Sequence, residues 1–430
     1  MIGWLAFAVL LPLSGCRCQD RVDYGWAFEE PEDATDTGRL DVPEPPDTRP
    51  DTPDTVHIPD SRDVPPVEDI APEPDAWDPE NVVSNIECRQ ALNDRTSLVI
   101  DDRGTAWLGY HSYSGRGCEL SSLVVTHRRA NSRWQRETLR RPHQGIFALS
   151  VIEPNRPISV FPDARDGQFK SAMRQGDGRW STQAFDIGSH TVGNGDGFDA
   201  THDADTYFVT FAADRGQQVR LFSYDTSAAN PTWKSRRGLR AQDPQAAMER
   251  GLRADTNDSV YLVHRNEDVG RFGLARYDKA DDLWPQRVYL PERYAGANVH
   301  SFVITEDFEL CLSGSFQQNL FVTCGTMFDL TAHEDRVFGG IDISERFPSS
   351  IVEGNNGTLY VAFNPTGNTA LRVAKGTPGG SWSVRTIYDG PSYGISTAID
   401  EDGKLALSFY TCEDGGRGTC SLKLVREQPW

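Results

Sequence analysis

Seven residues that could form a ligand-binding surface recur at intervals of about 50 residues. All are aromatic or cationic, and each stands just before a stretch expected to form an inner β-strand. They are His143, Phe198, Arg250, His300, Arg346, Phe347 and Tyr393. Aromatic rings and cationic groups brought together in one funnel would suit a glycan or a peptide. Taken singly, each could also be a rim contact or an ordinary loop residue.

The familiar catalytic motifs are missing from the sequence. It contains no GxSxG nucleophile elbow, no P-loop and no HExxH. Its nine histidines are scattered, and no pair has the spacing of a metal site on one element. The Asp-rich turn at residues 400–403 could attract calcium, but it lacks the distal acid of an EF-hand loop and also suits a tight turn. The sequence therefore predicts no cofactor, with calcium as the alternative.

A sialidase-like glycosidase is the alternative function. Residues 102–107, DRGTAW, partly match the Asp-box of sialidases, although Ile100 replaces the expected Ser or Thr and the match falls between strands one and two instead of three and four. Glycoside hydrolysis needs two carboxylates, or a tyrosine with an acid, close together. The acids that would have to converge are Glu153, Asp196, Glu249 and Glu345.

The elements that must position these residues form a sevenfold repeat. Each unit begins with a strand, a turn and a second strand, as in SLVIDDRGTAWLGY at residues 97–110, and continues with two further strands. The turns are anchored at Gly104, Arg156, Asp205, Asp258, Phe308, Gly357 and Gly403. A tryptophan opens the fourth strand at Trp134, Trp180, Trp233, Trp284 and Trp382, and the fifth unit lacks one.

Four short strands per unit are typical of a propeller blade, which cannot bury its faces without two neighbours. We therefore predict an all-β fold, a seven-bladed β-propeller of four-stranded antiparallel blades at residues 81–430, with the tryptophans packed between blades. The sequence reaches Trp430 where the outer strand of the seventh blade should begin. Residues 81–87, NVVSNIE, are predicted to supply that strand and so to close the ring without an exposed edge.

The first unit also resembles a known family. Ser97, Leu98, Asp101 and Gly104 are followed by WQRETL at residues 134–139. The pattern is similar to that of bacterial surface-lipoprotein β-propeller repeats, whose units read roughly S-L-x-x-D-x-x-G and W-x-x-E-T-V on a propeller like that of the sialidase superfamily. The resemblance covers residues 81–430 and is degenerate in units three to five. It implies an exported propeller more than any particular activity.

The chain has eight cysteines, which in an exported protein favours disulfides. Cys311 and Cys324 are predicted to face one another across the hairpin of the second and third strands of unit five. Cys412 and Cys420 bracket the corresponding loop of unit seven. By elimination Cys88 pairs with Cys118, because both fall in loops of the same propeller face. The alternative for each pair is free buried cysteines.

The N-terminal region predicts export and anchoring. Residues 1–15 form a short apolar run, too short for a permanent membrane span, that reads as a signal peptide. Residues 13–16, LSGC, resemble a lipobox, which would make Cys16 the lipidation site, although no Lys or Arg precedes the run. An uncleaved anchor or a late start is the alternative.

Residues 16–80 are predicted to be a disordered tether because they are acidic, rich in proline and poor in aliphatic residues. Residues 17–80 hold 20 Asp and Glu and 5 Arg, so their net charge is −15 of the whole chain's −20. An acidic tail with its own basic partner is the alternative. Because the rest of the chain has no basic surplus, nucleic-acid binding is not expected.

The sequence thus predicts an exported, lipid-anchored β-propeller on the outside of a bacterial membrane, with the outer membrane or cell surface as the expected site. It would act as a binding or scaffolding module for an envelope glycan or protein, and its head is expected to be monomeric.

Overall fold

The computed structural model divides the chain into two units, residues 1–64 and 65–430. The structure describes residues 77, 79–86, 96–114, 120–129, 132–140, 147–163, 168–185, 199–213, 218–240, 251–255, 259–266, 270–339, 349–365, 369–412 and 419–427. The predicted signal peptide, Cys16 and nearly all of the predicted tether lie outside these ranges, as do Cys88 and Cys118.

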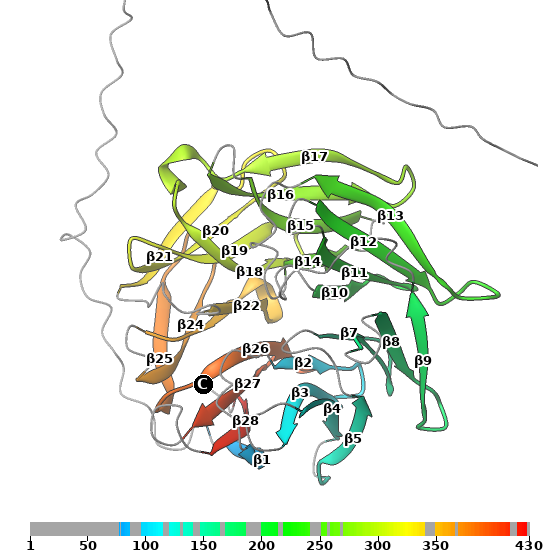
Figure 1. The fold of residues 1–430 in the computed structure, drawn as a ribbon. Coiled ribbons are helices and arrows are strands. Elements are labelled where there is room, and N and C mark those ends of the chain that lie inside the picture. The colour runs from blue at the N-terminus through cyan, green and yellow to red at the C-terminus, as the bar shows by residue number, and fades with distance from the viewer. Residues whose placement is uncertain are drawn as a thin grey trace, which may run out of the picture. The chain divides into compact units, whose positions relative to one another are not determined.

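Seven four-stranded antiparallel sheets make up the second unit (Figure 1). Blade 1 consists of β2 (Ser97–Ile100), β3 (Ala106–Ser114), β4 (Leu120–Arg128) and β5 (Gln135–Arg140). Blade 2 consists of β6 (Ala148–Glu153), β7 (Arg156–Pro162), β8 (Phe169–Arg174) and β9 (Trp180–Phe185). Blade 3 consists of β10 (Asp199–His202), β11 (Thr206–Ala213), β12 (Gln218–Asp225) and β13 (Trp233–Arg240). Blade 4 consists of β14 (Leu252–Ala254), β15 (Ser259–Asn266), β16 (Arg271–Asp278) and β17 (Leu283–Tyr289). Blade 5 consists of β18 (Asn298–Ile304), β19 (Leu310–Phe316), β20 (Asn319–Gly325) and β21 (His333–Gly339). Blade 6 consists of β22 (Ser349–Glu353), β23 (Leu359–Phe363), β24 (Ala370–Gly376) and β25 (Trp382–Asp389). Blade 7 consists of β26 (Tyr393–Ile399), β27 (Leu405–Cys412), β28 (Cys420–Arg426) and β1 (Glu80–Ile86).

Two short 3-10 turns lie in connections between strands: η4 (Glu292–Tyr294) between β17 and β18, and η5 (Asn355–Gly357) between β22 and β23. Among the described residues, no helix has the length and apolar character that crossing a membrane would require.

The N-terminal strand closes the ring. β1 pairs antiparallel with β28, so that Glu80 lies opposite Leu424 and Ile86 opposite Cys420. Blade 7 therefore has the strand order β1-β28-β27-β26, and its outer strand comes from the other end of the propeller sequence. Arg128 of blade 1 reaches across the closure to Glu80, with 2.6 Å between the guanidinium and the carboxylate. The predicted seven-bladed fold and the predicted closing strand are confirmed.

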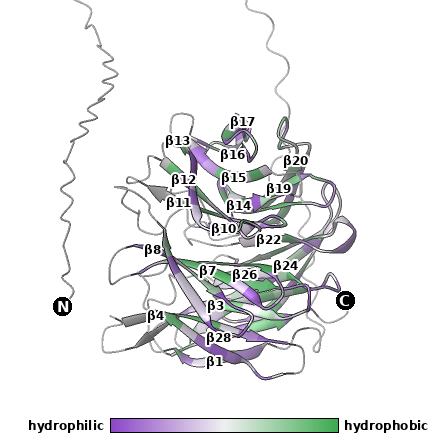
Figure 2. Cartoon of the chain, turned by 90° about the vertical axis from the view of Figure 1, so that its right-hand side faces the viewer, coloured by the Kyte–Doolittle hydropathy of each residue, from purple (hydrophilic) through white to green (hydrophobic). Residues whose placement is uncertain are grey.

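Burial explains the pattern of each strand. The second strand of a blade is covered on both faces by neighbouring blades, and all five residues of β23, LYVAF, are buried. An outer strand borders solvent, so β21, HEDRVFG, has one buried residue, Val337, and its other residues are exposed or partly exposed. Figure 2 shows hydrophobic segments inside the blades and hydrophilic ones toward the periphery. Charged side chains on these outer strands also oppose edge-to-edge aggregation.

The hydrophobic core consists of clusters that each join two neighbouring blades. One cluster joins blades 7 and 1, and the others join each following pair around the ring. The tryptophans take part, as predicted: the indole N–H of Trp233 donates to Ser171 Oγ at 2.8 Å, and that of Trp284 donates to the carbonyl of Arg237 at 2.7 Å. Each bond runs to the preceding blade, so the repeated tryptophan is an inter-blade contact.

Both described disulfides were predicted and are confirmed. Cys311 is bonded to Cys324 in blade 5, and Cys412 is bonded to Cys420 in blade 7. They lie at opposite ends of their hairpins, because Cys311 is near the start of its strand and Cys412 ends its strand. We call the end with the connections between strands 1 and 2 and between strands 3 and 4 of each blade the turn face, and the opposite end the loop face. Cys311–Cys324 is nearer the turn face, and Cys412–Cys420 is at the loop face.

Candidate functional site

Two of the seven predicted ligand-binding residues are described. His300 and Tyr393 lie in the inner strands β18 and β26, while His143, Phe198, Arg250, Arg346 and Phe347 lie outside the described residues. Tyr393 is the first residue of its strand, so it stands at the loop face, half-buried against the core between blades 7 and 1. Both described residues thus lie on inner strands of the propeller, His300 in blade 5 and Tyr393 in blade 7.

His300 lies inside the wall between blades 5 and 6. Only 4% of the residue is exposed, its Nδ1 is 2.9 Å from Ser349 Oγ, and its Nε2 is 3.1 Å from Ser315 Oγ. Burial lowers the pKa of His300 to about 3, so the ring is neutral near pH 7. At this position it joins two blades and supplies no positive charge to the central funnel.

The contact of His300 belongs to a belt of hydrogen bonds between inner strands. Hydroxyl and imidazole groups connect one inner strand to the next at 2.7–3.0 Å. The pairs are Ser150 with His202, His300 with Ser349, Ser350 with Thr397, and Ser396 with the backbone N–H of Leu98. Because buried polar groups need partners, this belt both satisfies them and fixes neighbouring blades in register.

A half-buried carboxylate between blades 1 and 2, Glu137, is bound on several sides by neighbouring side chains. Glu137 is 3.2 Å from His127 Nε2 and 3.2 Å from Arg174 Nε, and it also accepts a hydrogen bond from the indole of Trp180. Burial would raise the pKa of Glu137, but the hydrogen bonds from His127 and Trp180 and the charge of Arg174 lower it below its ordinary value. Glu137 is therefore held as an ionised link between blades.

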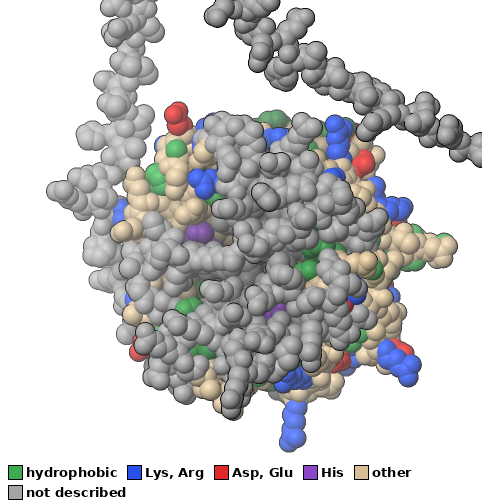
Figure 3. Space-filling view, in the orientation of Figure 1, with side chains coloured by type: hydrophobic (Ala, Val, Ile, Leu, Met, Phe, Trp, Pro, Cys, Tyr) green, Lys and Arg blue, Asp and Glu red, His purple; other side chains and the backbone are tan. Residues whose placement is uncertain are grey.

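The acids that a glycosidase would need are mostly beyond the described residues. Asp196, Glu249 and Glu345 are outside them, and Glu153 lies at the turn-face end of β6, where it forms an exposed ion pair with Arg156 at 2.5 Å. In the described part of the chain, no three His, Cys, Asp or Glu residues are placed to hold a metal ion. Figure 3 shows Lys and Arg side chains projecting from the periphery of the described surface.

The turn face of blade 5 differs from that of its neighbours in two residues and one disulfide. Phe308 stands at the turn anchor, His333 opens the outer strand in the place of the usual tryptophan, and the disulfide Cys311–Cys324 joins the two middle strands. Phe308 is 52% exposed and Phe328, in the other turn of this face, is 86% exposed. These two are the exposed large hydrophobic residues of the described part of the chain.

Phe308 adopts a backbone conformation that favours glycine. Its φ is +63°, and at the same place in the turn blades 1, 6 and 7 have Gly104, Gly357 and Gly403 with φ of +68°, +69° and +73°. A side chain in this left-handed region costs about 1–2 kcal/mol. Since half of the Phe308 side chain faces solvent, burial offsets little of that cost.

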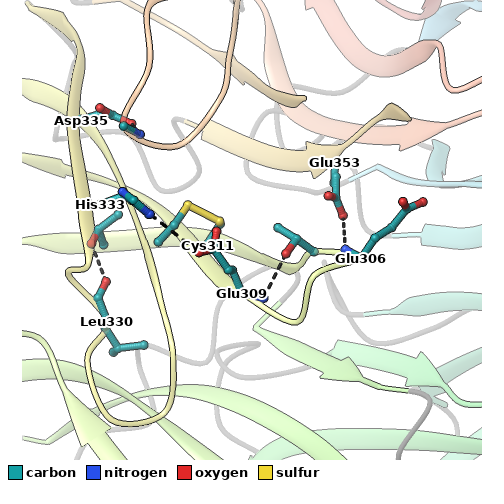
Figure 4. Close-up of a disulfide and its surroundings, with 11 residues drawn as sticks. Glu306, Glu309, Cys311, Leu330, His333, Asp335 and Glu353 are labelled. Atoms are coloured by element: carbon teal, nitrogen blue, oxygen red, sulfur yellow. Dashed lines mark hydrogen bonds and ion pairs between the residues drawn. A yellow bond between two sulfur atoms is a disulfide. The ribbon is translucent and has the colours of Figure 1, made fainter. Parts of the chain in front are cut away.

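Several acidic side chains lie in or beside the strand 1–2 turn of blade 5, and Figure 4 shows Glu306, Glu309 and Glu353 near the disulfide of Cys311. Glu306 and Asp307 are exposed beside Phe308, and the N–H of Glu306 donates to the Glu353 carboxylate of blade 6 at 2.8 Å. Burial, together with the charges of Glu306, Asp307 and Glu309, raises the pKa of Glu353. The negative charges are thus close enough to repel one another.

Side chains and backbone groups of the chain contact several acids of this region. His333 Nε2 is 3.8 Å from the Glu309 carboxylate, and Arg293 binds Glu334. Asp335 accepts a hydrogen bond from the backbone N–H of Gly379 in blade 6 at 2.9 Å. We call the surface made by Glu306, Asp307, Phe308, Glu309 and Phe328 the blade 5 patch. The sequence marked Phe308 only as a turn anchor, although a phenylalanine where sister units have glycine was a visible signal.

Comparisons with known proteins identify the architecture. No family model matches the chain, and no curated protein matches it. A structure of streptogramin B lyase has a TM-score of 0.52 at 10% identity, covering 82% of this chain and 98% of that one. A fungal lectin from Aleuria aurantia, described as a six-bladed β-propeller with a novel fucose recognition mode, has a TM-score of 0.45 at 11% identity, covering 71% and 98%. The intramolecular trans-sialidase of Ruminococcus gnavus has a TM-score of 0.47 at 10% identity, covering 81% and 98%. At these identities the likeness concerns the fold alone.

Proposed function

We propose that the chain is a binding module of the bacterial cell envelope that holds a glycan or a protein at its loop face. The observation that carries the proposal is the direction of the inner strands. In blades 2 to 7, the inner strands β6, β10, β14, β18, β22 and β26 all begin at the loop face. In the sequence the proposed residues other than His300 come at or shortly before these starts, which supports the proposal that they would share one surface.

The chemistry of these residues suits recognition. Phe198, Phe347 and Tyr393 would offer aromatic faces, and Arg250 and Arg346 would offer charged hydrogen-bond donors. A pocket that combines a few polar groups with aromatic surface is typical of ligand sites. His143 would join them at the rim, whereas His300 would hold the wall behind the site through Ser349 and Ser315.

The location forms the second part of the proposal. Cys16 would carry the lipid, and residues 16–80 would be an acidic tether between membrane and head. Two disulfides in the described residues favour an oxidising compartment outside the cytoplasm. Lipid attachment itself would appear as an increase in the mass of the N-terminal peptide that contains Cys16.

The test is binding of the full-length chain to an array of envelope polysaccharides, with retention and release of sugar products both recorded. Replacing Tyr393 and Phe198 with alanine should weaken retention at least about tenfold, since each aromatic contact contributes on the order of 1 kcal/mol. Phe328→Ser, at the opposite face, is the control and should bind like the parent. Release of sugar products would contradict the proposal and favour a glycosidase, while retention that both loop-face variants preserve would place the ligand elsewhere.

A further inference from the structure

The blade 5 patch contains an aromatic residue that the fold does not require. Residues 305–309 form the same five-residue turn as residues 101–105, 354–358 and 400–404, because in all four the first N–H donates to the fifth carbonyl at 2.8–3.1 Å. In three of these turns glycine occupies the fourth position, which has a positive φ. Phe308 therefore adopts a disfavoured conformation at a position where its ring is half exposed. Neither turn geometry nor burial accounts for the phenylalanine.

The second aromatic residue lies on the same face of the same blade. Strands β19 and β20 are paired, with Leu310 opposite Gly325 at their turn-face ends. Phe308 comes two residues before Leu310 and Phe328 three residues after Gly325, so both turns start from adjacent strand ends. The turn at residues 326–329 is fixed by hydrogen bonds between Thr326 and Asp329, and it leaves the Phe328 ring 86% exposed. Exposed aromatic residues that are grouped in this way are typical of contact sites.

Charge and spacing define the kind of partner. Glu306, Asp307 and Glu309 make the patch acidic, yet no three such groups in the described residues converge as metal ligands. Several separate cations fit such a surface better than one metal ion. A guanidinium group is suited to it, because its plane stacks on an aromatic ring while its N–H groups bind carboxylates. Residues 17–80 of the chain itself are excluded as the occupant by their net charge of −15.

We propose that the blade 5 patch binds an arginine-containing basic segment of a partner protein, with guanidinium groups placed between the rings of Phe308 and Phe328 and the carboxylates of Glu306 and Asp307. This site is separate from the loop-face site of the proposed function and does not depend on it. The two faces would allow the head to join a protein on one side to an envelope ligand on the other.

The experiment measures fluorescence anisotropy of a labelled peptide of alternating arginine and glycine, titrated with the full-length chain. Phe308→Gly and Phe328→Ser should each weaken binding about threefold, the size of an exposed cation–π contact. The double variant Glu306→Gln and Asp307→Asn should weaken it about fivefold and reduce its dependence on salt. A peptide with lysine in place of arginine should bind more weakly than the arginine peptide.

The matched control is the double variant Glu401→Gln and Asp402→Asn. It removes the same charge from the exposed strand 1–2 turn of blade 7, which has Gly403 where blade 5 has Phe308. Binding of the arginine peptide by this control should stay within about twofold of the parent, because the turn of blade 7 has no aromatic ring beside its acids to hold a guanidinium group. Equal losses in control and patch variants would overturn the proposal, as would an arginine peptide that does not bind the parent chain. Salt-dependent self-association in sedimentation that Phe308→Gly abolishes would also overturn it and make a second copy the occupant.

Discussion

The strand 1–2 turns of blades 1 and 5 have the same backbone and different side-chain contacts. In both, the N–H of the fourth residue donates to the first carbonyl, Gly104 to Asp101 at 2.8 Å and Phe308 to Thr305 at 2.9 Å. In both, a side-chain oxygen of the first residue accepts the N–H of the fifth, at 2.9 Å from Thr105 and 3.0 Å from Glu309. The backbone geometry is therefore independent of which residue stands in the fourth place.

The first side chain of the blade 1 turn, Asp101, is buried and binds groups of its own blade and of blade 2. One carboxylate oxygen of Asp101 accepts the N–H groups of Arg103 and Thr105, and the other accepts the indole N–H of Trp107 at 3.0 Å and the N–H of Asn155 in blade 2 at 3.1 Å. In blade 5, Thr305 has a single hydroxyl, and Glu306, Asp307 and Phe308 are exposed. The difference teaches that the turn of blade 1 stabilises the ring, while the turn of blade 5 presents a surface.

Replacing Asp101 of blade 1 with threonine, the residue that blade 5 has at this place in the turn, should have the largest effect on stability. Asp101→Thr keeps an acceptor for the Thr105 N–H but leaves the buried indole N–H of Trp107 and the half-buried backbone N–H of Asn155 without the carboxylate. Unpaired buried donors cost about 1–3 kcal/mol each, so the free energy of unfolding should fall by about 3 kcal/mol. Urea denaturation measures this change. Thr305→Ser, which keeps its hydroxyl, is the control and should change the value by less than about 0.5 kcal/mol.

The contribution of Asp101 should also depend on pH. Burial opposes ionisation, but the four hydrogen bonds together lower the pKa of Asp101 below its ordinary value of 3.8. A carboxyl group with a lowered pKa stabilises the folded state above its unfolded pKa, and this stabilisation is lost as the pH falls through the folded pKa. The difference between parent and Asp101→Thr should thus be constant from about pH 5 upward and shrink below about pH 4. A difference that grows toward acid pH would contradict this account.

Replacing Gly104 of blade 1 with phenylalanine, the residue that blade 5 has at this place in the turn, should have an intermediate effect on stability. Gly104→Phe introduces the left-handed conformation for a bulky residue, which costs about 1–2 kcal/mol, and its Cβ would lie 3.3 Å from Glu401 Oε1. Thermal and urea unfolding should both report the loss. Gly104→Asn is the matched control, because asparagine tolerates this region better, and its loss should be about half as large. Equal stability of Gly104→Phe and the parent would mean that Phe308 costs the protein nothing.

Removing one charge from beneath the blade 5 patch should have the smallest effect. Burial and the neighbouring acids raise the pKa of Glu353 above its ordinary value of 4.5, so ionisation of this group disfavours the folded state as the pH rises through the folded pKa. Glu353→Gln keeps an acceptor for the N–H of Glu306 and removes the repulsion. The free energy of unfolding at pH 7 should rise by about 0.3 kcal/mol and the gain should vanish near pH 4. A loss at pH 7 would show that the charge of Glu353 is stabilising.

The repeat predicted the fold because seven copies of one pattern, about 50 residues apart, leave few architectures open. The pairing of β1 with β28 and both described disulfides followed from the same register. The role of His300 did not, because its partner Ser349 is 49 residues away and joins it only when blades 5 and 6 pack. Asp101 was visible as part of the pattern of the first unit, whereas its bond to Asn155 depends on the position of the next blade. The blade 5 patch combines residues of two turns that the strand pairing brings to one end of the blade.

Equilibrium unfolding of Phe308→Gly tests the central comparison most directly. If Phe308 serves a surface contact, glycine at φ +63° removes a backbone cost and sacrifices only a half-exposed ring, so the free energy of unfolding should equal or exceed that of the parent by up to about 1 kcal/mol. A fall of more than about 1 kcal/mol would show that the ring stabilises blade 5 itself, and the contrast between the two turns would then be structural.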